Sequence, residues 1–341
     1  MNKVRTSVLK ATAIAPSNIA FSKYWGRKDN ILRLPANGSI SMTLSDLLTT
    51  TTVEFSPAYE RSSPSDKKDQ VTINGGGIEE GEEMRVIKHL DRVRKLSGIN
   101  FKAKVASKNN FPAGTGLASS ASGFAALTLA AISAAGLRLS DKELSILARQ
   151  GSGSACRSIP GGFVEWLNGD TSETSYATQI FPSDYWDIAD VVAIFTEEKK
   201  EVSSSTGHEA AQSSPFFKTR IAGMKQKNEE FKRFIKQRNF EKFGQLLERE
   251  ALEFHAITLT QNPYLIYWTA GTLATMKKTA VLRNKGLPVY FTVDTGQNIH
   301  LFVEGKNIKR LVSELKKLEG IKNIIINKPG EGTRLSENHL F

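Results

Sequence analysis

The sequence is poor in cysteine and in long apolar runs. Cys156 is the only thiol among 341 residues, which excludes an intramolecular disulfide and a metal site built from several cysteines. No run approaches the ~18 apolar residues of a membrane-spanning helix, and residues 1–6 (MNKVRT) lack the apolar core of a secretory signal. We therefore expect a cytoplasmic protein in a reducing compartment, with no membrane partner.

Acidic residues are too few to balance the basic ones. The chain has 46 Lys and Arg against 35 Asp and Glu, a formal net charge of +11, so acidic ligands are expected and nucleic acid is the first class to weigh. The basic residues concentrate in 225–242 and 306–317, where helices with a solvated face explain them. No nucleic-acid motif is recognisable. Small anionic molecules fit the charge equally well, and we expect no nucleic-acid partner.

Length and periodicity predict a two-domain α+β protein. With 40% hydrophobic residues, a chain of this length can bury about two cores. Strands are expected at residues 8–15, 39–44, 49–55, 101–106, 161–167, 191–196, 289–293, 299–304 and 321–326. Helices are expected at residues 79–96, 117–135, 141–150 and 308–318, and over most of 205–283. We place the domains at residues 1–190 and 191–341.

Two of the expected helices carry local start or stop signals. Helix 79–96 has Met84, Ile87, Leu90 and Val93 at helical spacing, and it ends at Gly98, where a C-cap glycine belongs. Helix 141–150 follows Ser140, with Glu143 three residues later. That spacing is typical of a capping box.

Residues 111–123 (FPAGTGLASSASG) form a loop of small residues before an Ala-rich helix. Gly114 and Gly116 would let backbone N–H groups approach an anion, and the helix dipole would favour negative charge at the same place. Hydroxyls for phosphate or Mg²⁺ would come from Ser119, Ser120 and Ser122. The loop is neither a Walker A sequence nor a Rossmann fingerprint. The alternative is a Gly/Ser turn that caps a packed helix.

Residues 15–28 bring Lys23, Arg27 and Lys28 together around Tyr24 and Trp25, just after an expected strand. This cluster suits a polyanionic substrate, because Arg grips phosphate by two hydrogen bonds and Lys supplies a compact charge. The alternative is a strand end with solvated basic residues and a buried Trp.

Residues 151–158 (GSGSACRS) resemble a second anion site, in which Arg157 could clamp a carboxylate or phosphate. A flexible turn is the alternative. We expect Cys156 to be a packing residue, since no His lies nearby in the sequence. Residues 202–208 (VSSSTGH) add a hydroxyl-rich loop, which by itself is also typical of a helix N-cap.

Residues 290–298 (YFTVDTGQN) place Asp294 at the end of an apolar strand, beside a glycine turn. A carboxylate in that position could accept a proton or orient a hydroxyl. An ordinary turn aspartate is the alternative.

In this order, the segments resemble the diphosphomevalonate decarboxylase family of the GHMP kinase superfamily. The resemblance covers residues 8–303, and the Lys-Tyr-Trp-Gly and Gly-Ser-Ala-Cys-Arg-Ser elements are its most specific parts. Phe254-His-Ala and Tyr267-Trp268 belong to it as well. It implies an N-terminal domain of the ribosomal-protein-S5 type and a ferredoxin-like C-terminal domain, with ATP and substrate in the cleft between them.

The resemblance also implies an activity. ATP phosphorylates the tertiary 3-hydroxyl of mevalonate 5-diphosphate, and that phosphate leaves together with CO₂ to give isopentenyl diphosphate. Mg²⁺ is expected to bridge the phosphates, and we expect a homodimer. Related branches leave two alternatives open, a decarboxylase of the monophosphate and a kinase that does not decarboxylate. A nucleic-acid-binding protein is the non-enzyme alternative.

The resemblance assigns roles to matching residues. Asp294 would orient or deprotonate the 3-hydroxyl, Lys23 would stabilise the developing charge, and Arg157 would hold the substrate carboxylate. The diphosphate tail would be bound by Tyr24, Arg27, Ser152 and Ser154. ATP would be bound by Gly114, Gly116, Leu117, Ala118, Ser119, Ser120 and Ser204. The metal ligands are not identified by the sequence.

Three positions depart from the family pattern. Arg27 stands where the family commonly has Lys, which keeps the charge and changes the geometry. His208 stands where Met is usual, and Ser205 where Arg or Thr is frequent. These changes bear on the contacts to the γ-phosphate and the diphosphate.

Overall fold

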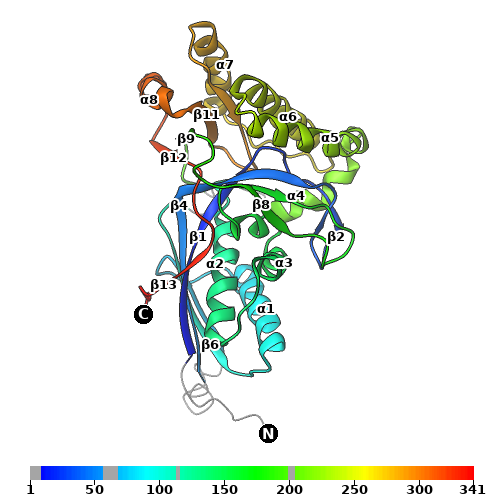
Figure 1. Cartoon of the computed structure of the whole chain (residues 1–341), viewed down its shortest axis with the longest axis vertical. Coiled ribbons are helices and arrows are strands. Elements are labelled where there is room, and N and C mark those ends of the chain that lie inside the picture. Colours follow the sequence, from blue (N-terminus) through cyan, green and yellow to red (C-terminus); the bar gives the residue numbers. More distant parts are fainter. Residues whose placement is uncertain (1–8, 57–67, 113–115, 199–203) are drawn as a thin grey trace.

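The computed structural model describes residues 9–56, 68–112, 116–198 and 204–341. These residues form two main β-sheets with helices packed against both (Figure 1). The α+β class expected from the sequence is confirmed. No helix within these ranges is long and apolar enough to cross a membrane.

The larger sheet has seven strands in the order β13-β1-β4-β6-β5, with β7 paired to β4 and β8 paired to β7. All of its pairs are antiparallel except β5 with β6. Its strands are β1 (Leu9–Ala20), β4 (Ser39–Ser56), β5 (Gln70–Ile73), β6 (Lys102–Asn109), β7 (Phe163–Trp166), β8 (Ala177–Phe181) and β13 (Arg334–Ser336). The sequence patterns did not predict β5, β8 or β13.

β4 is one strand of 18 residues where the sequence patterns predicted two, at 39–44 and 49–55. The expected break was wrong because the strand continues through residues 45–48, but its pairing with β1 is irregular there. Pro16 of β1 pairs with Leu48 and Asn18 pairs with Thr43, so four residues of β4 lie opposite one residue of β1 and form a bulge in β4.

Helices α1 (Glu80–Ser97), α2 (Ser119–Ala134) and α3 (Asp141–Gly151) lie together on one face of the larger sheet (Figure 1). The Gly98 C-cap of α1 has a φ of 71°, and the Ser140–Glu143 capping box of α3 is present, so both local predictions are confirmed.

The face of α1 that packs inward agrees only in part with the apolar residues singled out in the sequence. Val86, Leu90 and Val93 are buried, whereas Met84 is 44% exposed. The buried residues keep the i, i+4, i+7 spacing of a helix face. Met84 and Ile87 are apolar but lie beside that buried stripe. The periodicity therefore predicted the helix correctly and included two residues that are not part of its buried face.

The second sheet has the order β10-β11-β9-β12, with every pair antiparallel. Its strands are β9 (Ile188–Ile194), β10 (Tyr290–Thr292), β11 (Ile299–Glu304) and β12 (Asn323–Asn327). The helices of this part are α4 (Ser204–Ala210), α5 (Phe217–Lys236), α6 (Phe240–Thr260), α7 (Ala270–Asn284) and α8 (Ile308–Leu315). Apolar residues of the sheet pack on one face with α7 and α8, and on the other with α5 and α6.

The core beside α5 and α6 also contains residues of the larger sheet. Phe21, which follows β1, is fully buried, and its ring lies 4.9 Å from that of Phe243 on α6 and 5.5 Å from that of Phe302 on β11. This apolar cluster therefore joins the two sheets. The division at residues 190 and 191 stays a prediction.

Candidate active site

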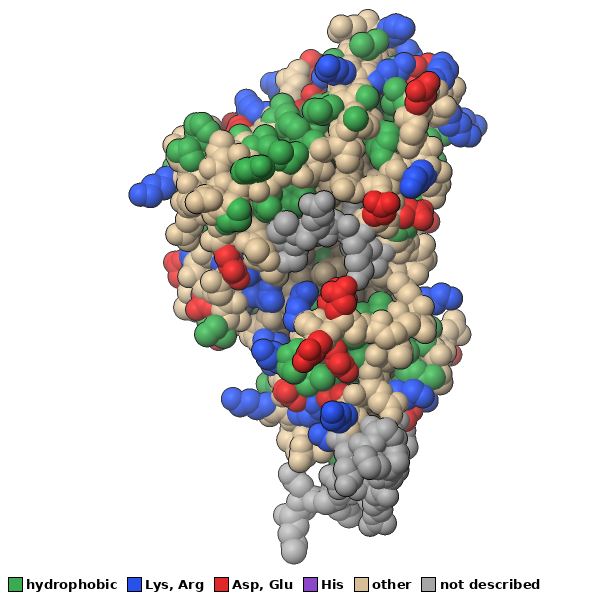
Figure 2. Space-filling view, turned by 180° about the vertical axis from the view of Figure 1, so that it is seen from behind, with side chains coloured by type: hydrophobic (Ala, Val, Ile, Leu, Met, Phe, Trp, Pro, Cys, Tyr) green, Lys and Arg blue, Asp and Glu red, His purple; other side chains and the backbone are tan. Residues whose placement is uncertain are grey.

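A cavity of about 850 Å³ lies where the end of β1, the start of α2 and the turn after β10 meet. Its volume is in the range of small-molecule sites. Figure 2 shows the surface hollowed near mid-height, with basic side chains beside the hollow. Most of the predicted site residues line the cavity: Lys23, Tyr24, Arg27, Gly116, Ala118, Ser119, Ser120, Ser152, Ser154, Arg157, Ser204 and Asp294.

Three other predicted residues are not among those that line the cavity. Gly114 lies outside the described residues. Leu117 has a buried side chain in the core that joins the sheets, and its carbonyl accepts a hydrogen bond from Ser17 Oγ at 2.6 Å. Ser122 is fully buried and its hydroxyl lies 2.6 Å from that of Thr49. The Ser122 hydroxyl therefore joins α2 to the sheet and is not part of the cavity lining.

Lys23 and Asp294 form an ion pair in this cavity, although they are 271 residues apart in the sequence. Lys23 lies just beyond β1 and Asp294 just beyond β10, so the ends of two strands from different sheets meet here. Lys23 Nζ also donates to the carbonyl of Ala20 at 2.7 Å. The ammonium is almost fully buried, while a fifth of the Asp294 side chain is exposed to the cavity.

The surroundings set the charge states of this pair. Burial alone would raise the pKa of Asp294, but the adjacent Lys23 ammonium, with His300 and Arg157, holds that pKa below its usual range. Burial lowers the pKa of Lys23, and the ion pair with Asp294 opposes that effect. Asp294 is thus an ionised carboxylate at neutral pH, able to accept a hydrogen bond from a hydroxyl.

Arg157 is held rigidly at the wall of the cavity. It comes from the short 3₁₀ helix Gly153–Ser158, and its side chain is buried. Its Nε donates to Asn18 Oδ1 at 3.0 Å and its Nη1 donates to Ser39 Oγ at 2.9 Å. Both partners are neutral, so the guanidinium charge has no direct carboxylate partner among the described residues and remains available to an anionic ligand.

Tyr24 and Arg27 form a second polar unit. Arg27 Nε donates to the Tyr24 hydroxyl at 3.0 Å, and burial raises the pKa of Tyr24, so the phenol stays protonated. The Tyr24 ring packs edge-on against Trp166. A side chain at Gly153 would come within 2.9 Å of the Tyr24 ring, which explains the glycine in the second Gly/Ser segment.

His208 has a defined place between the rings of Tyr24 and Trp25, at 4.1 and 4.4 Å between ring centres. Its Nδ1 accepts a hydrogen bond from the backbone N–H of Gly26 at 3.0 Å. A thioether could fill this space but accepts hydrogen bonds only weakly. The imidazole therefore fixes the turn after Trp25. Ser205 also lines the cavity.

Gly116 brings the glycine loop against the Asp294 turn. Its φ is 94°, and a Cβ there would lie 2.4 Å from Gly296 Cα. Close backbone approach thus adds a second reason for this glycine. Ala118, with a φ of 55°, precedes α2 without a side-chain cap, and the start of α2 faces the cavity. An uncapped helix start suits an anion.

Two arginines that the sequence patterns did not single out also line the cavity, Arg33 and Arg85. Arg33 is half-buried, and burial with the nearby Arg27 and Arg85 lowers its pKa to about 10. Arg85 lies on α1, and its Nη2 donates to the carbonyl of Gly151 at 3.3 Å. Neither residue belongs to a motif, because α1 and the loop after β2 (Arg27–Asp29) meet only in the folded chain.

Comparisons with known proteins agree with this geometry. Residues 15–177 match the family model of the diphosphomevalonate decarboxylase-like N-terminal domain, and residues 190–335 match that of the mevalonate 5-diphosphate decarboxylase C-terminal domain. A diphosphomevalonate decarboxylase from Ganoderma lucidum is 36% identical over 335 residues, covering 91% of this chain and 82% of the relative.

Solved structures give the same result. Mevalonate diphosphate decarboxylase from Staphylococcus aureus is 35% identical, with a TM-score of 0.90 over 97% of this chain and 99% of its own. The complex described as MDDEF with MVAPP, AMPPCP and magnesium is 36% identical, with a TM-score of 0.89 over 97% of this chain and all of its own. The GHMP-type fold is confirmed, and this chain belongs to the diphosphomevalonate decarboxylase family.

Proposed function

We propose that this protein is an ATP-dependent decarboxylase that converts mevalonate 5-diphosphate to isopentenyl diphosphate, ADP, phosphate and CO₂. The observation that carries the proposal is the Lys23–Asp294 ion pair, which lies in one cavity with Arg157 and the start of α2. Family membership and the relative that binds MVAPP, AMPPCP and magnesium support it.

Asp294 and Lys23 are the residues we assign to the reacting hydroxyl. The ionised Asp294 accepts a hydrogen bond from the 3-hydroxyl and takes its proton as the oxygen becomes a nucleophile. Lys23 stabilises the negative charge that develops beside it, in a buried setting where a fixed cation acts strongly. ATP with Mg²⁺ supplies the phosphoryl group that converts this hydroxyl into a leaving group.

Arg157 is the residue we assign to the substrate carboxylate. Its guanidinium is fixed by Asn18 and Ser39, so it binds without much loss of side-chain freedom. Loss of CO₂ leaves the electron pair of the broken C–C bond to form the double bond as phosphate departs. We assign the diphosphate tail to Tyr24, Arg27, Ser152 and Ser154, with Arg33 and Arg85 adding charge on the same cavity wall.

The start of α2 fits nucleotide phosphates. We assign them to the backbone of Gly116 and Ala118 and to the hydroxyls of Ser119 and Ser120. Ser204, whose Oγ lies 2.9 Å from Thr295 Oγ1, approaches from the Asp294 side. The described residues contain no cluster of three His, Cys, Asp or Glu side chains suited to a metal. Serine hydroxyls and phosphate oxygens are the donors we propose for Mg²⁺.

The test is parallel measurement of ADP and CO₂ from purified protein with Mg²⁺-ATP and mevalonate, its 5-phosphate or its 5-diphosphate. Equal release of both products with the diphosphate alone is the expected result. ADP without CO₂ would identify a kinase, and preference for the monophosphate would identify the related decarboxylase. No turnover with any of the three would contradict the proposal.

We infer a cytoplasmic homodimer that binds no nucleic acid, with domains divided at residues 190 and 191. Analytical ultracentrifugation tests the dimer, and limited proteolysis tests the division. RNA binding that weakens steeply with salt would contradict the absence of a nucleic-acid partner.

A further inference from the structure

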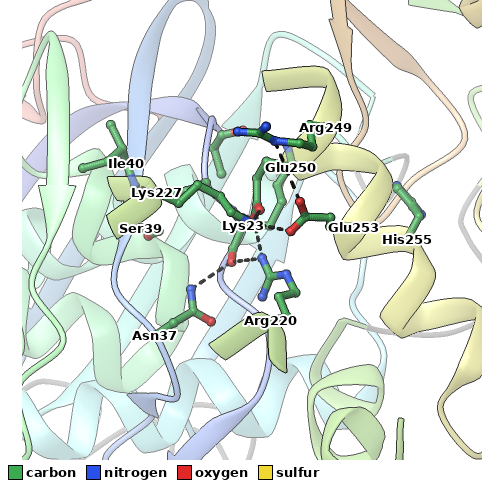
Figure 3. Close-up of polar contacts among 12 residues, drawn as sticks. Lys23, Asn37, Ser39, Ile40, Arg220, Lys227, Arg249, Glu250, Glu253 and His255 are labelled. Atoms are coloured by element: carbon green, nitrogen blue, oxygen red, sulfur yellow. Dashed lines mark hydrogen bonds and ion pairs between the residues drawn. The ribbon is translucent and has the colours of Figure 1, made fainter. Parts of the chain in front are cut away.

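A buried group of charged side chains surrounds Lys23 (Figure 3), and none of its members lines the cavity. It consists of Arg220 and Lys227 from α5 and Glu250 from α6. The Glu250 side chain is fully buried. Its Oε1 accepts from Arg220 and its Oε2 accepts from Lys227 Nζ at 2.6 Å.

This group holds the main chain of Lys23. Glu250 Oε1 also accepts the backbone N–H of Lys23 at 3.0 Å. Arg220 Nη2 donates to the Lys23 carbonyl at 2.9 Å, and Asn37 Nδ2 donates to the same oxygen at 3.0 Å. Both polar backbone atoms of Lys23 are thus bonded to side chains that lie far away in the sequence.

Side-chain anchoring matters at this position because β1 ends at Ala20. Beyond that residue no sheet ladder fixes the backbone of Lys23. Its Nζ must nevertheless meet Asp294, which comes from the other sheet. The position of the Lys23 ammonium therefore depends on the side chains that hold the backbone N–H and carbonyl of Lys23.

The arrangement is costly if it serves stability alone. Within the described chain, Nε and Nη1 of Arg220 are buried without a hydrogen-bond partner. Unpaired buried donors destabilise a fold, and a buried ion-pair cluster is weak evidence for stabilisation. Arg220 instead directs one nitrogen, Nη2, to both the Lys23 carbonyl and Glu250. Such departures from full pairing are expected at functional sites.

We propose that Glu250, supported by Arg220, is a positioning residue that sets the place of Lys23 for the reaction proposed above. This inference rests on the proposed function. Glu250 does not line the cavity, so its effect reaches the substrate only through Lys23.

The charge of Glu250 also acts on Lys23. The charged groups that face the Lys23 ammonium are Asp294, Glu250 and Arg157, and the buried His255 lies near it. The negative charge of Glu250 raises the pKa of Lys23 against the effect of burial. Removal of that charge therefore lowers the pKa of Lys23, so the ammonium loses its proton at lower pH.

The test compares Glu250→Gln with Glu253→Gln. Both variants remove a carboxylate that pairs with Lys227, but only Glu250 touches Lys23. For Glu250→Gln we expect kcat with Mg²⁺-ATP and mevalonate 5-diphosphate to fall about 10- to 100-fold, with KM values within about twofold of wild type. The alkaline limb of its pH profile should move to lower pH. Glu253→Gln should match wild type in both.

Thermal unfolding and active-site titration separate positioning from a structural role. If Glu250→Gln only destabilised the fold, the kcat of its folded fraction and its alkaline limb would match wild type, and the inference would be overturned. If Glu250→Gln does not fold, the same measurements are made on Arg220→Lys. This variant keeps the positive charge, but its shorter side chain no longer reaches the Lys23 carbonyl. A lower kcat at unchanged KM supports the inference, and an unchanged kcat overturns it. Inactive wild-type protein would overturn the proposed function itself.

Discussion

At the scale of single residues, the chemistry depends on charges that are buried but paired. Lys23 lowers the pKa of Asp294 against the effect of burial, and Asp294 and Glu250 raise the pKa of Lys23 against the effect of burial. Without Lys23, burial would raise the pKa of the Asp294 carboxyl group. The two residues that we assign to the reacting hydroxyl therefore favour each other's charged forms.

Replacement of Asp294 by Asn tests this view most directly. The amide keeps the shape of the side chain and removes the charge. Turnover should fall by several orders of magnitude while substrate binding changes little, because an interaction made in the transition state is lost. Steady-state kinetics with equilibrium binding of the diphosphate substrate provides the measurement. Wild-type turnover by Asp294→Asn would remove this residue from the mechanism.

Cys156 is expected to be chemically silent. It is fully buried, its Sγ lies 3.1 Å from the carbonyl of Gly153, and burial raises its pKa to about 12. The thiolate, which is the reactive form, is then almost absent at neutral pH. Native protein should resist iodoacetamide while urea-unfolded protein is alkylated at once, as mass spectrometry would show. Rapid alkylation of the native protein would contradict the burial.

At the scale of elements, the start of α2 and the turn after β10 are packed backbone against backbone. A Cβ on Gly116 would lie 2.4 Å from Gly296 Cα, so this contact leaves no room for a side chain at residue 116. Two segments that the sequence motifs describe separately are therefore in direct backbone contact.

Gly116→Ala should separate these two loops. An added Cβ clashes with Gly296 and the φ of 94° disfavours Ala, so we expect a loss of about 1–3 kcal/mol of unfolding free energy and weaker ATP binding. Gly223→Ala on α5 is the matched control, because its Cβ meets open space. That control should gain about 0.5–1 kcal/mol. Urea unfolding measures the stability of both variants, and nucleotide titration measures their affinity for ATP. If Gly116→Ala matched Gly223→Ala in both, the close packing of Gly116 against Gly296 would be contradicted.

His89 connects α1 to α2 and makes this contact sensitive to acid. Its Nε2 lies 2.9 Å from Thr128 Oγ1, and burial lowers its pKa from 6.5 to about 3. The folded protein keeps His89 neutral while the unfolded chain binds a proton below pH 6.5. Stability should therefore fall as pH decreases from about 6.5 to about 3, by about 1.4 kcal/mol per pH unit. Urea unfolding at several pH values gives the dependence of the unfolding free energy on pH. This dependence should be weaker in His89→Gln, and an unchanged dependence would show that His89 does not cause the loss of stability in acid.

At the scale of the whole molecule, one apolar cluster contains residues of both sheets. Phe21 has aromatic contacts with Phe163, Phe231, Phe243 and Phe302, which come from both halves of the chain. Because Phe21 precedes Lys23 by two residues, the packing that joins the sheets also supports the segment that carries the proposed catalytic Lys23. The segment from Phe21 to Lys23 thus couples the stability of the fold to the geometry of the site.

Phe21→Ala should reveal that coupling. Removal of a fully buried ring leaves a cavity between the sheets and should cost about 3–5 kcal/mol of unfolding free energy. We also expect lower turnover, because the backbone toward Lys23 loses its support. Denaturant unfolding followed by fluorescence and circular dichroism gives the measurement. A loss below about 1 kcal/mol would mean that the two sheets do not depend on Phe21.

The sequence by itself was enough for features that depend on neighbours along the chain. The Ser140–Glu143 capping box and the Gly98 C-cap are decided by bonds within one helical turn, so spacing alone predicted them. The strong apolar periods predicted most helices and most of the strands, although they divided β4 in two. The motifs around Lys23, Arg157 and Asp294 were recognisable because each is a short, continuous segment.

The tertiary structure alone decided what depends on distant neighbours. β5, β8 and β13 are short strands whose ladders form only beside strands already in place, and β4 stays one strand although four of its residues bulge opposite one residue of β1. Lys23 meets Asp294 across 271 residues and Glu250 across 227. The buried anchors Glu250 and Arg220 carry no local signal, because a charge inside a helix normally indicates a solvated face. Their burial follows from how α5 and α6 pack against the segment after β1, and only the folded chain determines that.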